Sequence, residues 1–146
     1  MVSGQWSVVR KNLDFNLYLI TDRHQIGGRT LIGVLEDALK GGVKAVQLRE
    51  KNLNTRELFD LAQSIRRLTI QYNAKLFIND RLDIALAVKA DGVHLGLKSF
   101  STINVRNFLN SQFTVHSPQF LIGVSAHSLD EARTAETEGA DFITFG

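Results

Sequence analysis

Ala45-Val-Gln-Leu-Arg-Glu-Lys51 is the stretch that decides the fold, because polar and apolar side chains alternate along it. Successive side chains of a strand point to opposite faces, so Val46 and Leu48 would share one face and the polar residues the other. A strand buried in a parallel sheet is normally apolar on both faces, because helices cover one face and neighbouring side chains fill the other. One face of this strand is therefore expected to meet something other than a hydrophobic core.

The polar row of this strand consists of Gln47, Arg49 and, just beyond the strand end, Lys51. Burying an unpaired guanidinium costs several kcal/mol, so the row is best explained by an anion bound above the end of the strand. An internal salt bridge to Asp22 or Asp80 is the alternative interpretation. The row alone leaves both open.

Similar apolar runs recur from residue 17 onward and alternate with amphipathic segments. Strands are predicted at 17–21, 45–50, 75–80, 92–96, 121–126 and 142–146, and helices at about 31–40, 55–72, 82–88, 102–110 and 128–139. Asn54 with Glu57 predicts a capping box before the second helix. Ser128 with Glu131 predicts another before the fifth.

This alternation is typical of a parallel α/β fold. Periodicity does not separate a (β/α)8 TIM barrel from a doubly wound open sheet, since both repeat the same βα unit, but the polar row within a strand favours the barrel. About six strands and five helices fall short of a closed barrel, which usually needs roughly 200 residues or more. We therefore expect an incomplete (β/α)8 barrel over residues 13–146, ending before it could close, with residues 1–12 as an N-terminal extension.

Composition narrows the class of protein. A chain of 146 residues with 44% hydrophobic content can bury a core as one domain. The net charge is only +2 and no basic run is interleaved with aromatic residues, so no nucleic-acid partner is expected. The absence of cysteine excludes a disulfide framework and a thiol nucleophile.

Residues 1–12 lack the apolar core of a signal peptide, and no run reaches the ~18 apolar residues of a membrane span. A cytoplasmic protein without a membrane partner is therefore expected.

Polar residues also follow the other predicted strands, at the edge where barrels place their catalytic groups. They are Thr21, Asp22, Asn79, Asp80, Ser99, Ser125 and His127. His127 directly precedes a helix and follows Ser125 by two residues, so its side chain could share a pocket with an anion bound at that helix start. Asp80 also has a simpler explanation as the N-cap of the short third helix. His94 is expected to be a core histidine rather than an acid or base.

Five motifs stand in the order and spacing of one enzyme family. They are Gln47-Leu-Arg-Glu-Lys51, Phe77-Ile-Asn-Asp80, Ala90-Asp-Gly-Val-His-Leu-Gly96, Gly123-Val-Ser-Ala-His-Ser128 and Gly139-Ala-Asp-Phe-Ile143. From about residue 17 to residue 146, the chain resembles the thiamine phosphate synthase and thiazole tautomerase family. Each motif is weak alone, but five in register are specific.

The resemblance implies a transferase of thiamine biosynthesis that couples an aminopyrimidine pyrophosphate to a thiazole phosphate and releases pyrophosphate, assisted by Mg²⁺. Small phosphorylated substrates are the partners it implies. The residues that would hold the pyrimidine and its pyrophosphate are Gln47, Arg49, Lys51, Asn79 and Ser125. Asp80 would be a magnesium ligand. The candidate catalytic residues are Arg49, Lys51 and His127.

Two departures from the synthase pattern affect this interpretation. Where the synthases place the second magnesium carboxylate, this chain has Ser99 in Gly96-Leu-Lys-Ser99, so a weakened metal site is expected, with Lys98 partly replacing the charge of the cation. The chain also lacks the segment that follows strand six in the family, which carries a Thr, a Lys and the phosphate-binding turns. The activity of this chain is therefore in question.

The first departure resembles the tautomerase branch, in which the residue matching His127 acts as acid or base and no metal is needed. The intact polar row and the Asn79-Asp80 pair favour the synthase, with the tautomerase as the alternative. A phosphate-binding remnant without catalysis is a further alternative. The open edge of the last strand would also allow a homo-oligomer.

Overall fold

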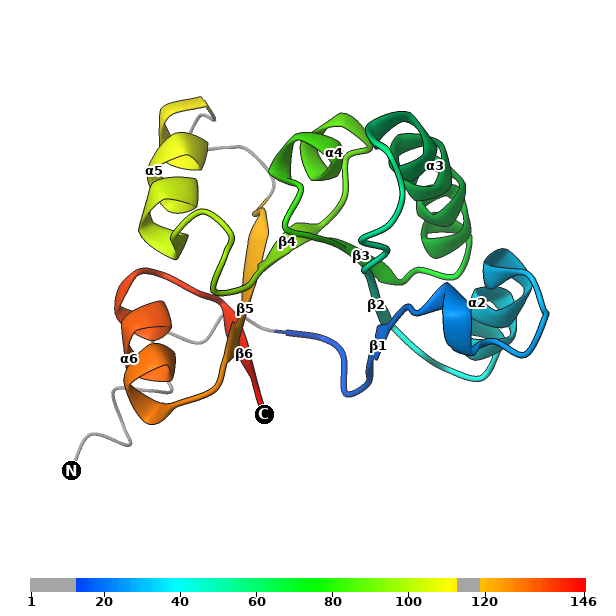
Figure 1. Ribbon diagram of the computed structural model, residues 1–146, viewed down its shortest axis with the longest axis horizontal. Helices are drawn as coiled ribbons and strands as arrows, with labels where there is room; N and C mark the ends of the chain where they lie inside the picture. The colour runs from blue at the N-terminus through cyan, green and yellow to red at the C-terminus, as the bar shows by residue number, and fades with distance from the viewer. Residues whose placement is uncertain (1–12, 113–118) are drawn as a thin grey trace.

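The computed structural model describes residues 13–112 and 119–146, which form one sheet of six parallel strands with helices between them (Figure 1). The strands are β1 (Tyr18–Ile20), β2 (Ala45–Leu48), β3 (Lys75–Asn79), β4 (Gly92–Leu95), β5 (Leu121–Ala126) and β6 (Phe142–Phe145). The helices are the short η1 (Arg23–Gln25), then α2 (Leu31–Lys40), α3 (Thr55–Gln71), α4 (Leu82–Ala87), α5 (Thr102–Gln112) and α6 (Leu129–Thr137). The predicted bounds of the strands and helices hold to within two residues, whereas the expected N-terminal extension 1–12 lies outside the described residues.

The order of the strands separates the two predicted architectures. Each strand pairs with its neighbour in sequence, in the order β1-β2-β3-β4-β5-β6, and every pair is parallel. A doubly wound sheet would reverse its strand order partway and carry helices on both faces. In Figure 1, α2 to α6 instead follow one another around the outside of a curved sheet. The fold is therefore an α/β half-barrel of the TIM-like kind, and the open-sheet alternative is wrong.

Ring contacts across the interior show how strongly the sheet curves. Six strands spaced about 4.8 Å apart would separate the first from the last by about 24 Å in a flat sheet. The rings of Tyr18 in β1 and Phe142 in β6 instead have centroids 5.3 Å apart. Phe77 and His94, from the strands between, and Phe15, before β1, join the same cluster of rings. The rings of Phe15, Tyr18, Phe77, His94 and Phe142 thus form an aromatic layer on the inner face of the sheet.

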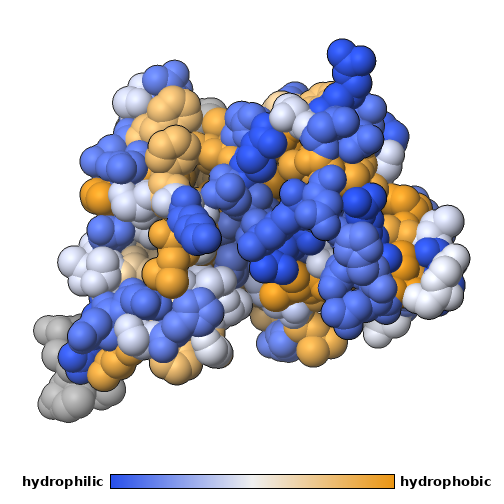
Figure 2. Space-filling view, in the orientation of Figure 1, coloured by the Kyte–Doolittle hydropathy of each residue, from blue (hydrophilic) through white to orange (hydrophobic). Residues whose placement is uncertain are grey.

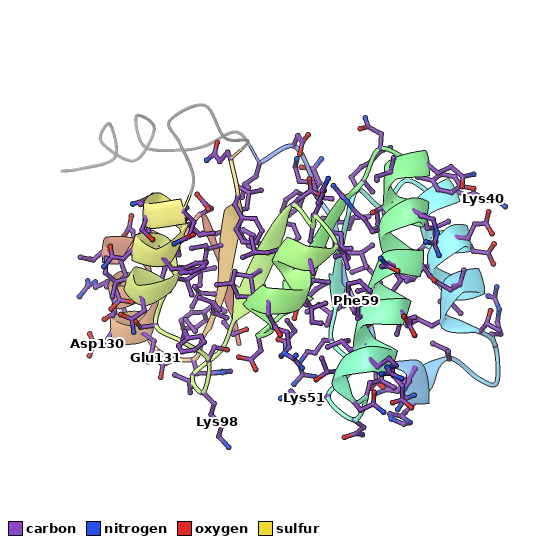
Figure 3. All side chains as sticks on the ribbon, turned by 90° about the horizontal axis from the view of Figure 1, so that it is seen from above. Lys40, Lys51, Phe59, Lys98, Asp130 and Glu131 are labelled. Atoms are coloured by element: carbon purple, nitrogen blue, oxygen red, sulfur yellow. The ribbon has the colours of Figure 1, made fainter. Side chains whose placement is uncertain are left out.

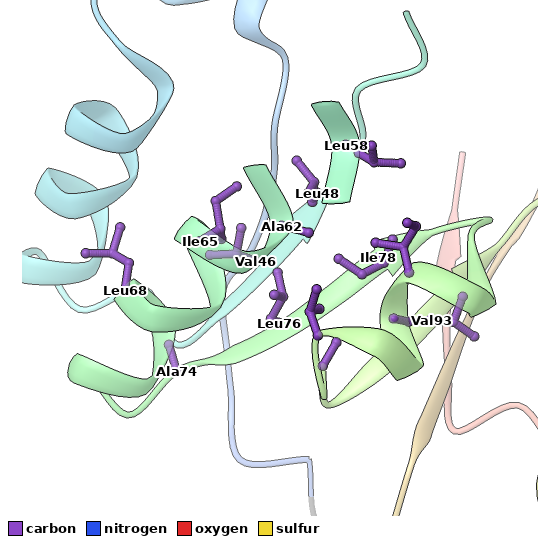
Figure 4. Packing of buried hydrophobic residues seen from close by; sticks show 14 of the residues in the cluster. Val46, Leu48, Leu58, Ala62, Ile65, Leu68, Ala74, Leu76, Ile78 and Val93 are labelled. Atoms are coloured by element: carbon purple, nitrogen blue, oxygen red, sulfur yellow. The ribbon is translucent and has the colours of Figure 1, made fainter. Parts of the chain in front are cut away.

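The outer face of the sheet packs against the helices, as the alternation in β2 predicts. Val46 and Leu48 belong to the core between sheet and helices (Figure 4). Ala45 belongs instead to the inner cluster with Phe77. Amphipathic spacing in the sequence predicts that Leu58, Leu61, Ala62, Ile65 and Leu68 form the buried stripe of α3, and all of these except the partly buried Leu61 are buried. The buried members of that stripe are Leu58, Ala62, Ile65 and Leu68. No helix of the described residues is long and apolar enough to cross a membrane.

Two of the three predicted helix starts need correction. Asn54 and Glu57 form the complete capping box before α3. Before α6 the Ser128 side chain accepts from the Glu131 backbone N–H, but the Glu131 carboxylate accepts from the N–H of His127, so the box is formed from one side only.

Asp80 does not cap α4, so the simpler explanation of this residue is wrong. The N-cap position belongs to Arg81, and no side chain caps the helix. The Asp80 backbone N–H donates to the His94 carbonyl at 2.8 Å, which extends the β3–β4 pairing by one residue. Its φ of 63° then turns the chain sharply. The carboxylate of Asp80 is thereby left free of a structural role in the helix.

Gly123 is required by the aromatic layer, because an added Cβ would lie 2.4 Å from a Phe142 ring carbon and 2.7 Å from Nδ1 of His94. We expect Gly123→Ala to lower the free energy of unfolding by about 1–3 kcal/mol, through displacement of these rings. Urea denaturation monitored by circular dichroism measures the change. Gly96→Ala is the matched control, since its Cβ would meet nothing within 4 Å, and an equal loss in both variants would contradict the argument.

Candidate functional site

A cavity of about 570 Å³ lies over the carboxyl ends of the central strands. In Figure 2, which looks onto this side, hydrophilic side chains gather over the middle of the face. Most of the predicted site residues line the cavity, namely Arg49, Lys51, Asn79, Asp80, Ser99, Ser125 and His127. The turn after β4 adds Lys98 to the rim. The parallel strands thus bring together side chains from four separate motifs.

Gln47 is the predicted site residue that does not line this cavity. Its side chain is 1% exposed and lies on the inner face of the sheet, where its amide nitrogen donates to the Tyr18 hydroxyl at 3.2 Å. Period-two alternation places Gln47 on the face of Arg49, but it cannot say how deep each residue lies. Gln47 therefore belongs to the layer beneath the cavity.

A hydrogen-bonded chain runs through this deeper layer and reaches the cavity at Ser125. The Tyr18 hydroxyl lies 2.9 Å from Nδ1 of His94, and Nε2 of His94 lies 2.9 Å from the Ser125 hydroxyl. Since Gln47 donates to Tyr18, the phenolic hydrogen is directed to Nδ1, and a neutral imidazole must then carry its hydrogen on Nε2. His94 therefore donates to Ser125, whose own hydrogen can go to Thr144, 3.3 Å away, or to a ligand in the cavity. Ser125 is set as a hydrogen-bond donor.

Burial keeps the imidazole and the phenol of this chain neutral. Desolvation, reinforced by the positive charge of Arg49, lowers the pKa of His94 from 6.5 to about 4. Desolvation raises the pKa of Tyr18 above its ordinary value, and the hydrogen bond from Gln47 opposes this only in part. The expectation that His94 is a core residue is confirmed, since it is 2% exposed. Tyr18 was not among the predicted site residues, although a hydroxyl on the inner face of the first strand is the signal that could have identified it.

Arg49 and Lys51, at the end of β2, are both exposed, so the expectation of a buried guanidinium is wrong for Arg49. The backbone N–H of Arg49 donates to the Thr21 hydroxyl at 3.0 Å, but its guanidinium forms no ion pair within residues 13–112 and 119–146. The same holds for the ammonium group of Lys51 over this part of the chain. Asp22, one proposed partner, instead accepts hydrogen bonds from the residues of η1. The salt-bridge interpretation of the row is therefore wrong for the described residues.

Two other charged residues of the cavity are neutralised by neighbours. The carboxylate of Glu50 accepts from the backbone N–H of Arg23 at 2.9 Å and lies 3.7 Å from its guanidinium. Arg81 binds both carboxylate oxygens of Asp83, at 3.0 and 2.8 Å. Neither Glu50 nor Arg81 therefore has its full charge available to a ligand.

Comparison with known proteins identifies the family of this site. The family model described as thiamine monophosphate synthase matches residues 17–146, which include every residue of the cavity named above. The chain belongs to the thiamine monophosphate synthase family.

Relatives in this family share both sequence and fold with the chain. A putative thiamine-phosphate synthase of Geobacter sulfurreducens is 55% identical over 134 residues, covering 92% of this chain and 60% of that protein. The thiamine-phosphate synthase of Clostridium tetani is 44% identical over 136 residues, covering 93% of this chain and 62% of that protein. The solved structure of a thiamine phosphate pyrophosphorylase from Pyrococcus furiosus superposes with a TM-score of 0.78 at 39% identity, covering 90% of this chain and 60% of that one. The chain thus spans about three-fifths of the length of these relatives.

The magnesium ion implied by the family resemblance does not fit the residues present. Among the described residues no three His, Asp or Glu side chains gather closely enough to hold a metal. In the cavity, Asp80 offers a carboxylate, while the Ser99 hydroxyl accepts from the backbone N–H of Gly96 at 3.0 Å. Mg²⁺ in proteins is usually held by one or two carboxylates together with the phosphates of a substrate. Asp80 supplies the one carboxylate that this set requires as a minimum, but the positive charges of Arg49, Lys51 and Lys98 in the same cavity disfavour a divalent cation beside it.

His127 lines the cavity with its ring anchored at one nitrogen. Nδ1 is hydrogen-bonded to the Gly146 carbonyl, so Nδ1 carries the hydrogen and Nε2 is left as an acceptor in the neutral ring. The backbone N–H of His127 donates to Glu131, which fixes the start of α6. Ser125 and His127 both line the cavity. The catalytic role of His127 stays a prediction.

Proposed function

We propose that this chain acts in thiamine biosynthesis, where its cavity binds an aminopyrimidine pyrophosphate for transfer of the pyrimidine group to a thiazole phosphate. The observation that carries the proposal is the pair of uncompensated cations, Arg49 and Lys51, beside Asn79 in one cavity. Uncompensated cations at the carboxyl ends of barrel strands suit a highly charged phosphate ligand. Membership of the thiamine monophosphate synthase family supports the choice of that ligand.

In this proposal the protein stabilises a leaving group. The carbon–oxygen bond to pyrophosphate breaks with its electron pair going to the pyrophosphate, and the lone pair of the thiazole nitrogen forms the new carbon–nitrogen bond. Arg49 and Lys51 offset the negative charge as it develops on the departing oxygen. The Ser125 hydroxyl, set as a donor by His94, meets an acceptor nitrogen of the pyrimidine. No step in this scheme uses an acid or base with a perturbed pKa.

Removing Arg49 tests the anion site directly. Arg49→Ala is expected to weaken binding of inorganic pyrophosphate roughly tenfold, because a charge-assisted hydrogen bond to the anion is lost. Isothermal titration calorimetry on the purified chain measures the dissociation constant. Arg133→Ala is the matched control, since Arg133 is exposed on α6 and does not line the cavity.

The outcomes separate the proposal from its alternatives. Equal affinity in the two variants would place the anion elsewhere and overturn the proposal. Formation of thiamine phosphate from the two phosphorylated substrates, lost in Arg49→Ala, would support transfer by this chain. Interconversion of thiazole isomers without thiamine phosphate would instead indicate the tautomerase, for which His127 is the candidate acid or base.

A further inference from the structure

We propose that the cavity binds its phosphate ligand without a magnesium ion, with the ammonium group of Lys98 supplying positive charge at the place where a metal would otherwise act. The inference rests on the proposed function, because it concerns the same anion in the same cavity. It commits to a ligand class, pyrophosphate or a phosphate ester, and to a cation that belongs to the protein.

The balance of charge in the cavity supports this inference. Once the pairs of Glu50 with Arg23 and of Arg81 with Asp83 are set aside, the remaining cations lining the cavity are Arg49, Lys51 and Lys98, against the carboxylate of Asp80. None of these three cations forms an ion pair within the described ranges. Three positive charges against one negative charge attract a polyanion and repel a divalent cation.

The turn after β4 fixes Lys98 at the rim. The backbone N–H of Ser99 donates to the Gly96 carbonyl at 3.1 Å, and the Ser99 hydroxyl accepts from the Gly96 N–H at 3.0 Å. These two bonds close a tight turn whose outer corner carries Lys98. In Figure 3, Lys98 and Lys51 project from the same side of the molecule, while Lys40 lies toward the opposite side. Lys51 and Lys98 thus line the cavity from two different loops on the same side of the molecule.

The chemistry of the turn also disfavours a metal. A serine hydroxyl is neutral, and one of its acceptor positions is already engaged by Gly96. A hard cation such as Mg²⁺ favours charged oxygen ligands and gives up its waters reluctantly. A lysine ammonium binds phosphate as a compact point charge and needs no fixed coordination geometry. Lys98 thus supplies a cation of the protein itself, and Ser99 offers no carboxylate to a metal cation.

Calorimetric titration of inorganic pyrophosphate into the full chain tests the inference in excess EDTA and again in millimolar Mg²⁺. We expect similar dissociation constants in the two buffers. Lys98→Ala should weaken binding in EDTA roughly tenfold, because one of the facing charges is removed. Lys89→Ala is the matched control, since Lys89 is exposed before β4 and does not line the cavity.

A double variant, Lys98→Ala with Ser99→Asp, exchanges the cation for a carboxylate. It should bind pyrophosphate poorly in EDTA and recover affinity when Mg²⁺ is added. Circular dichroism checks that each variant is folded, and Lys98→Ala alone keeps the test valid if the double variant does not fold. Failure of Mg²⁺ to restore binding in a folded double variant would overturn the inference.

The wild-type result distinguishes the two proposals. Pyrophosphate binding that requires Mg²⁺ would overturn the metal-free inference and leave the proposed function intact. No binding in either buffer would overturn both. Equal losses in Lys98→Ala and Lys89→Ala would show that Lys98 does not face the anion, which overturns the inference alone.

Discussion

Replacing Phe77 with alanine is expected to lower the free energy of unfolding by about 3–5 kcal/mol. Phe77 is fully buried at the centre of the aromatic layer, and its ring makes edge contacts with Phe15, Tyr18 and Phe142 at centroid distances of 6.0, 5.4 and 5.2 Å. Truncation removes the transfer free energy of the ring and leaves a cavity that β-strands on three sides cannot fill by a small shift. Urea denaturation followed by circular dichroism gives the difference.

Phe100→Ala is the matched control for this substitution. Phe100 is 69% exposed, so the same chemical change should alter the free energy of unfolding by no more than about 0.5 kcal/mol. Similar losses in the two variants would mean that the inner face does not hold the sheet in its curved form. A loss in Phe77→Ala together with a broadened transition would indicate that β1 and β6 separate before the rest of the sheet.

The curvature that Phe77 supports is also the part of the fold that the sequence reveals least. The alternation of Val46 and Leu48 with polar residues predicts both faces of β2, because the period of a strand depends only on local geometry. The contact between Tyr18 and Phe142 depends on how five successive strand pairings accumulate twist. The residues near Tyr18 or Phe142 in the sequence do not determine this accumulated twist. The sequence therefore favours a barrel but does not exclude an open sheet.

The site shows the same division between local and non-local information. The residues that follow strand ends, such as Asn79 and Ser125, could be placed at one edge because parallel strands share their direction. The depth of Gln47 could not be predicted, since it depends on Tyr18 reaching across from the neighbouring strand. The role of Asp80 was also ambiguous from sequence, because an Asp just before a helix can be either an N-cap or a ligand of a bound ion. The structure decides against the cap, because the N-cap position of α4 belongs to Arg81 and no side chain caps the helix.

The buried histidine of this network should make stability fall as the medium becomes acidic. The pKa of His94 is about 4 in the fold against 6.5 in its ordinary state, so between these values the unfolded chain takes up a proton that the folded chain refuses. The contribution is complete above pH 6.5, declines as the pH falls from 6.5 to 4, and is absent below. A difference of this size corresponds to about 3 kcal/mol over the whole interval. Carboxylates add their own dependence of stability on pH, so a variant that lacks His94 must be compared with wild type at each pH.

His94→Gln should flatten this decline by about 3 kcal/mol between pH 7 and pH 4, measured by urea denaturation at a series of pH values. The variant starts from a lower stability at pH 7, because the bonds to Tyr18 and Ser125 are altered, but the steepness is the quantity compared. His24→Gln is the control, since that exposed side chain meets water in the folded and unfolded states alike. If His94→Gln declined as steeply as wild type, His94 would be protonated inside the fold. Its Nδ1 could then no longer accept from Tyr18 at mildly acidic pH, and the hydrogen-bonded chain to Ser125 would be altered below about pH 6.5.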